Sequence, residues 1–139
     1  MGESRLVWLE KEQFVGFDGA GHPVVISTQE AENAVGLKPT DLLMLALASC
    51  SAVDLVRILA KQQQSMTGLE IAVRGEQEPE APWRFTSIHL TYRLRGRALN
   101  EERARKAVEL AEVKYCSVAA SLRPQVTITH DLELSEGPA

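Results

Sequence analysis

Cysteine is scarce in this sequence, which contains only Cys50 and Cys116. Two residues so far apart do not make the dense disulfide framework of a small secreted domain, and they lack the short spacing of a zinc site. Free cysteine is among the most buried residue types, so composition alone favours two thiols that simply pack in a core. Any chemical role for the pair has to be argued from the residues around them.

Concentrated positive charge and long apolar runs are also missing. The net charge is −4, and no cluster of Lys and Arg forms a stripe. Phosphate binding needs such a surface, so we expect no nucleic-acid partner. The most apolar run, residues 42–48, is far shorter than the ~20 residues that span a bilayer. The start shows no apolar signal segment, so we expect no membrane association and a cytoplasmic protein.

The 139 residues, of which 45% are hydrophobic, predict one domain over residues 1–139. Short strands are predicted at 6–9, 14–17 and 22–26, followed by a polar loop at 29–36. A long helix is expected from Thr40 to Gln63, with Pro39 before it, Thr40 as N-cap and Asp41 at its positive end. From 42 to 48 this helix is apolar on every side, which gives the first indication of a homodimer.

The second half of the sequence alternates strands with isolated helices. Alternating apolar and polar residues predict strands at 69–74 and 88–95, and a last strand is expected at 126–134. Asn100 is predicted to cap a helix with an inner stripe of Ala104, Ala107, Val108 and Ala111, and a short helix is predicted at 116–122, before Pro124. This order, with its short connections, favours α+β over a doubly wound parallel sheet.

Both cysteines lie among small residues, in the segments 48–52 and 116–121. Small side chains let backbones approach closely, so the two segments could meet with the thiols between them; tight helix packing explains the same pattern equally well. A thiolate attacks a peroxide, and the resulting sulfenic acid needs a second thiol nearby to escape over-oxidation. An apolar lining would favour an organic peroxide, since burial contributes about 0.8 kcal/mol per CH₂.

Two segments resemble the signature of the OsmC/organic hydroperoxide resistance family. They are residues 36–54, GLKPTDLLMLALASCSAVD, and residues 112–118, EVKYCSV. The resemblance implies antiparallel sheets wrapped around a long central helix in an intertwined homodimer. It also implies thiol-dependent reduction of organic hydroperoxides, with Cys50 as peroxidatic nucleophile and Cys116 as resolving thiol. No metal or other cofactor is implied, and an external dithiol, with a lipoyl-type donor as a precedent, would supply the electrons.

The sequence departs from the peroxidase branches of that family in two places. Those branches carry Glu directly after the turn proline, where this chain has Thr40, and Asp41 lies about 100° further round the helix. They also carry an activating Arg in the N-terminal part, for which Arg5 is no clear match. These departures favour a second hypothesis, a non-catalytic dimer that binds a small hydrophobic or electrophilic ligand with the thiols as sensors. A third is a structural dimer with core cysteines and no pocket between them.

Other polar residues are predicted to have structural roles. Asp54 and Arg57 follow Cys50 and are interpreted as an ion pair rather than as groups that tune the thiol. Glu112 and Lys114 are predicted to lie on a solvated loop, and Tyr115 either lines the pocket or packs. The histidines, which are predicted to be surface residues without an acid–base or metal role, are His22, His89 and His130.

Overall fold

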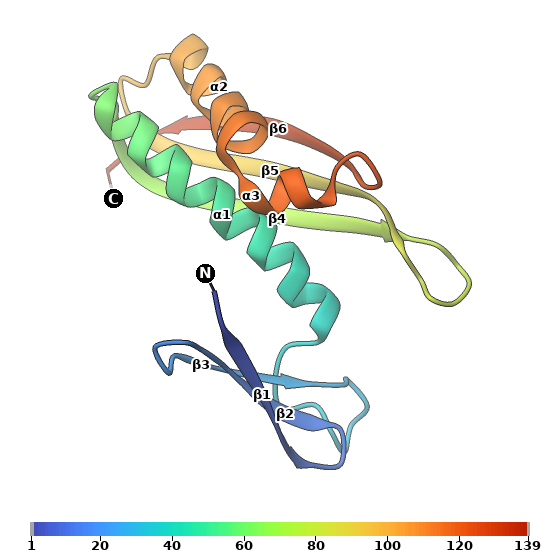
Figure 1. The fold of residues 1–139 in the computed structure, drawn as a ribbon. Coiled ribbons are helices and arrows are strands. Elements are labelled where there is room, and N and C mark those ends of the chain that lie inside the picture. The colour runs from blue at the N-terminus through green and yellow to red at the C-terminus, as the bar shows by residue number, and fades with distance from the viewer. Residues whose placement is uncertain (1, 139) are drawn as a thin grey trace. The chain divides into compact units, whose positions relative to one another are not determined.

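Strands and helices alternate along residues 2–138, which are the part of the chain described by the computed structural model (Figure 1). The fold class is α+β, as the sequence predicted. Contacts between residues divide the chain into two units, one up to Leu43 and the other from Met44 onward. Each unit is described by itself.

The N-terminal unit contains an antiparallel sheet of β1 (Ser4–Glu10), β2 (Gln13–Asp18) and β3 (Pro23–Ser27), in that order. The predicted loop after β3 is tied back to the sheet. The Ser27 hydroxyl accepts hydrogen bonds from the N–H groups of Val35 (3.1 Å) and Gly36 (3.0 Å). Gly36 is required here, because a Cβ would lie 2.3 Å from the carbonyl oxygen of Val25.

The long helix α1 (Pro39–Lys61) begins one residue before the predicted Thr40. Proline suits this first position because its missing N–H needs no partner there. One side of α1 is buried through residues spaced three or four apart: Leu47, Ala48, Ser51, Leu55 and Leu59. Another side exposes Leu45, Val53 and Val56 at 48%, 50% and 43%. The helix is therefore apolar in more than one direction, as expected.

By length and composition alone, α1 would also be able to cross a membrane, with a mean hydropathy of 2.0 over an 18-residue window. Core helices of soluble proteins satisfy the same criterion, so this property does not identify a membrane protein. The buried side of α1 packs within the second unit, where Ser51 is hydrogen-bonded to a strand residue.

The second unit contains the sheet β4 (Ser65–Gln77), β5 (Phe85–Arg97) and β6 (Thr127–Glu136), in that order. β4 and β5 are antiparallel, but β6 pairs with β5 in parallel. The sheet is therefore mixed, and the expectation of purely antiparallel pairing was wrong for this pair. The reason is the long helical connection between β5 and β6, which returns the chain in the same direction.

Three helical segments form that connection: α2 (Glu101–Glu109), the π-helix η1 (Leu110–Tyr115) and α3 (Ser117–Leu122). They lie with α1 over one face of the sheet (Figure 1). Asn100 caps α2 as predicted, with its side-chain oxygen 2.9 Å from the N–H of Arg103. The predicted inner stripe is buried, and so are the β5 residues Ile88, Leu90, Tyr92 and Leu94.

Candidate redox site

Cys116 lies in the short break between η1 and α3. Its extended backbone, with φ −73° and ψ 108°, makes it the N-cap of α3. The sulfur accepts a hydrogen bond from the N–H of Ala119 at 3.3 Å and lies 3.9 Å from the carbonyl oxygen of Leu47 on α1. The break in the helical connection therefore directs this buried thiol toward α1.

Cys50 approaches the same point from α1. Its sulfur is 3.7 Å from the hydroxyl oxygen of Ser117, the residue directly after Cys116. The pKa of the Cys50 thiol also responds to Cys116 and to the backbone N–H groups of Ser117 and Val118, which lie beside it. The structure thus brings together the two residues that the sequence singled out, and both thiols are free.

The surroundings displace the pKa values of the two thiols in opposite directions. Burial raises the pKa of Cys50, but the hydrogen bonds from Val118, Cys116 and Ser117 outweigh it and leave the pKa below its ordinary value. Burial raises the pKa of Cys116 to about 11, and its hydrogen bond to Cys50 and the negative charge there act in the same direction. Cys50 is therefore the more acidic of the two thiols, and Cys116 is protonated at neutral pH.

A buried hydroxyl pair lies beside the thiols. Ser51 follows Cys50 on α1, and its hydroxyl oxygen is 2.6 Å from the hydroxyl oxygen of Tyr92 on β5. Burial raises the pKa of Tyr92, and the charge of Glu112 raises it further. Tyr92 is therefore a neutral phenol that joins α1 to the sheet at this position.

Glu112 and His130 differ from the sequence prediction. The side chain of Glu112 is 0% exposed; its carboxylate is 3.5 Å from Nη2 of Arg123 and hydrogen-bonds Nδ1 of His130. This bond to Glu112 raises the pKa of His130, which favours the cation. The prediction of a solvated Glu112 was wrong, and His130, which was predicted as a surface residue, is only part-exposed and pairs with it. A signal existed, because Glu112 lies four residues after Val108 and extends the inner stripe of α2.

A pocket of about 440 Å³ lies between α1 and η1, and neither cysteine lines it. It begins at Asp54, one helical turn after Cys50, and includes Tyr115, the residue before Cys116. Its lining residues are Asp54, Arg57, Ile58, Lys61, Gln62, Leu110 and Tyr115. Within the described residues, neither Asp54 nor Arg57 has an ion-pair partner within 4.0 Å, so the predicted pair does not form in this chain.

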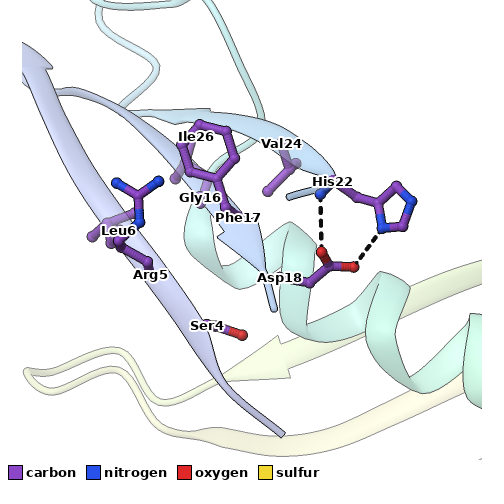
Figure 2. A pocket seen from close by; sticks show the side chains of 9 residues that line it. All are labelled: Ser4, Arg5, Leu6, Gly16, Phe17, Asp18, His22, Val24 and Ile26. Carbon is purple, nitrogen blue, oxygen red and sulfur yellow. Dashed lines mark hydrogen bonds and ion pairs between the residues drawn. The ribbon is translucent and has the colours of Figure 1, made fainter. Parts of the chain in front are cut away.

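A second hollow, of about 460 Å³, belongs to the N-terminal sheet (Figure 2). At its rim, the Asp18 carboxylate is 2.7 Å from Nδ1 of His22 and also accepts the backbone N–H of that residue at 2.9 Å. The Arg5 guanidinium lies 4.8 Å from the ring centroid of Phe17. This hollow contains no cysteine, and residues 2–138 contain no group of three or more His, Cys, Asp or Glu that could hold a metal.

One thiol lies on a long helix and the other at the N-cap of a later short helix, in an α+β unit with a mixed sheet. This arrangement defines a class of paired-thiol proteins. The family model described as "OsmC-like protein" matches residues 30–131, and the chain belongs to this family. Membership of this family, together with the adjacent thiols, supports a redox or peroxide-related role.

Relatives cover nearly the whole chain. Protein YhfA of Escherichia coli K12 is 35% identical over 132 residues, which are 95% of this chain and 97% of that protein. Among solved structures, a hypothetical protein from Aquifex aeolicus VF5 is 26% identical with a TM-score of 0.82, covering 97% of this chain and 98% of that one. The organic hydroperoxide resistance protein OhrB of Bacillus subtilis, at 16% identity, TM-score 0.64 and coverage of 96% and 98%, shares the fold.

Proposed function

We propose that this protein reduces organic hydroperoxides, with Cys50 as the attacking thiolate, Cys116 as the resolving thiol and an external dithiol as reductant. The observation that supports this most directly is the opposite displacement of two neighbouring thiol pKa values. A lowered pKa raises the thiolate fraction of Cys50, and the buried protonated thiol of Cys116 beside it is protected from reacting first.

The proposed reaction has three balanced steps. The Cys50 thiolate attacks the outer oxygen of the hydroperoxide, the O–O bond breaks, and the alkoxide takes a proton to leave as an alcohol. The Cys50 sulfenic acid then reacts with the Cys116 thiol, which forms the S–S bond and releases water. Finally the external dithiol exchanges with this disulfide, restoring both thiols and leaving as a cyclic or linear disulfide.

The neighbouring pocket suits the organic part of the substrate. Ile58, Leu110 and the ring of Tyr115 give it apolar walls. Each CH₂ group buried there would contribute about 0.8 kcal/mol, which hydrogen peroxide cannot obtain. We therefore propose a preference for hydroperoxides with a hydrocarbon tail.

We further propose that the protein acts as a homodimer in the cytoplasm. Leu45, Val53 and Val56 are large apolar residues on an exposed side of α1, and a second copy of the chain is the partner that the family fold implies. Val53→Asp would place a charge in that contact. Sedimentation should show a dimer for the wild type and a shift toward monomer for the variant, with Lys106→Asp on α2 as a surface control. A monomeric wild type would contradict the dimer.

The enzymatic proposal is tested by following cumene hydroperoxide consumption with dithiothreitol as reductant. The wild type should turn over well above the rate of free dithiothreitol. Cys50→Ser should abolish consumption, because the nucleophile is lost. Cys116→Ser should slow the cycle at the resolving step and accumulate Cys50 sulfenic acid, which dimedone traps. Wild-type protein no faster than the free dithiol would contradict the assignment.

A second candidate function is non-catalytic binding of a small hydrophobic or electrophilic ligand, with the thiols as sensors. It is supported by the partners of Cys50, which among the described residues are a hydroxyl, a thiol and backbone N–H groups rather than a cationic side chain. This function predicts that cumyl alcohol, a product analogue with no oxidising group, raises the melting temperature of a Cys50→Ser variant, while the wild type shows no peroxide turnover.

A further inference from the structure

The segment that carries Cys116 is fastened at both ends by one buried group. Glu112 lies before the cysteine in η1, and Arg123 follows the last residue of α3. The Arg123 guanidinium is 3.5 Å from both the backbone oxygen and the carboxylate of Glu112. We call Glu112, Arg123 and His130 of β6 the Glu112 clasp. It closes a loop around Cys116, the resolving thiol of the proposed cycle.

The clasp is built as a charged cluster in the core. A fully buried carboxylate is costly unless cations and hydrogen bonds compensate it. Here Arg123 and His130 contact the two carboxylate oxygens, and Arg123 also bonds the Ile128 carbonyl oxygen at 3.5 Å. The remaining charged groups that act on His130 are Glu109 and Asp131. The cluster thus links η1, α3 and β6 at one point.

The same cluster is connected to the Cys50 side of the site. The His130 ring meets the Tyr92 ring edge-on, with centroids 5.9 Å apart and planes at 88°. The Tyr92 hydroxyl in turn bonds Ser51, the neighbour of Cys50. The two thiol-bearing segments are therefore held through one continuous set of contacts.

We propose that the Glu112 clasp is a positioning device that holds Cys116 within bonding reach of Cys50. A disulfide requires an S–S distance near 2.05 Å and a narrow range of dihedral angles. α3 has only six residues, and a helix of that length does not hold its own position without tertiary anchors. The contribution of the Glu112 clasp to turnover rests on the proposed function, but the positioning of Cys116 does not.

The test uses thiol–disulfide exchange, which needs no peroxidase activity. Oxidised glutathione converts the Cys50–Cys116 dithiol into the disulfide and releases two molecules of glutathione. The equilibrium constant then reports how well the fold holds the thiols together. Glu112→Gln and His130→Gln should lower this constant on the order of 10- to 100-fold, which is the size of effect expected from a small misplacement.

A matched control is available on the same sheet. His89 of β5 also bonds a carboxylate, that of Asp131 at 3.0 Å, but it lies on the opposite face of the strand from the buried Leu90 and Tyr92. His89→Gln should leave the equilibrium constant unchanged. Alkylation of Cys50 at pH 7 should slow in reduced Glu112→Gln and His130→Gln, because the segment that the clasp holds supplies the groups that lower the pKa of Cys50, and it should keep the wild-type rate in His89→Gln.

The outcomes separate positioning from simple structural support. A folded Glu112→Gln variant with a wild-type equilibrium constant would overturn the proposal, and so would a loss that His89→Gln reproduces. If Glu112→Gln does not fold, His130→Gln decides, because His130 lies at the edge of the cluster with its side chain 29% exposed. An altered equilibrium in a protein that never reduces cumene hydroperoxide would support the clasp and contradict only the proposed function.

Discussion

Iodoacetamide should distinguish the two thiols of the folded protein at neutral pH. With a pKa of about 11, Cys116 is a thiolate in only about one molecule in 10⁴ at pH 7. An ordinary thiol, with a pKa near 8.5, is ionised in roughly one molecule in 30 at the same pH. Ionisation alone therefore slows Cys116 by about 300-fold relative to an ordinary thiol, and its burial slows it further. Cys50 has the opposite displacement, so it should be alkylated first.

The assay is a time course of alkylation between pH 6 and 10, in which each cysteine peptide is quantified by mass spectrometry. The rate for Cys50 should reach its plateau at a lower pH than in the denatured protein, whereas the rate for Cys116 should still rise at pH 10. Denatured protein, in which both thiols are exposed, provides the reference rates. Equal rates at pH 7, or modification of Cys116 before Cys50, would refute the assignment of the two thiols.

The same assay tests the cause of the lowered pKa. Cys116→Ala removes a thiol that donates to the Cys50 sulfur and should therefore raise the pKa of Cys50. Ser117→Ala removes a hydroxyl donor and should shift it in the same direction, to a smaller extent because the backbone N–H of Ser117 remains. A Cys50 titration that neither substitution moves would show that these hydrogen bonds do not set its acidity.

Three further predictions concern the core and the pocket. Tyr92→Phe leaves the buried Ser51 hydroxyl without its partner and should lower the free energy of unfolding by about 1–3 kcal/mol in urea titrations, with Tyr92→Phe/Ser51→Ala costing less than the sum of the two single changes. Glu112 raises the pKa of His130 in the folded protein. The stability that this pair contributes is therefore complete below the pKa of His130 in the unfolded chain, about 6.5, and is lost as pH rises through its pKa in the folded protein. His130→Gln should remove this pH dependence from the free energy of unfolding. Ile58→Asp should raise the KM for cumene hydroperoxide about tenfold while leaving alkylation of Cys50 unchanged, and an unaltered KM would show that the substrate does not use this pocket.

Most of the fold follows from local signals in the sequence. Pro39 and the absence of glycine or proline across the following residues predicted α1 to within two residues at each end. Asn100 predicted the start of α2, and the alternation around Tyr92 predicted β5. The parallel pairing of β6 was missed because strand direction depends on how the intervening helices cross the sheet, and no local residue pattern records that path.

The site was predictable only in part. The small residues beside Cys50 and Cys116 correctly indicated two segments that could approach each other. Glu112 was misplaced because charged residues are almost never fully buried unless paired, and its partners come from segments later in the chain. The spacing of Glu112 from Val108 was the one local sign of its burial, whereas the π-helical turn and the pairing with His130 became visible only with the tertiary structure.

The chain has no clear match for the Arg that activates the thiol in the peroxidase branches of the family, which raises the question of how Cys50 can ionise. In this chain, backbone N–H groups of Ser117 and Val118, a hydroxyl and a second thiol occupy the positions around its sulfur. Each is a neutral donor, and neutral donors stabilise a thiolate less than a cation does. The pKa of Cys50 is consequently lowered, but by a set of partners that includes the resolving thiol itself. Replacing Cys116 by a residue without a thiol therefore removes one of the groups that lower the pKa of Cys50. The contact between the two thiols therefore affects both the acidity of Cys50 and the formation of the disulfide. A substitution at Cys116 should alter both the attack on the hydroperoxide and the resolving step.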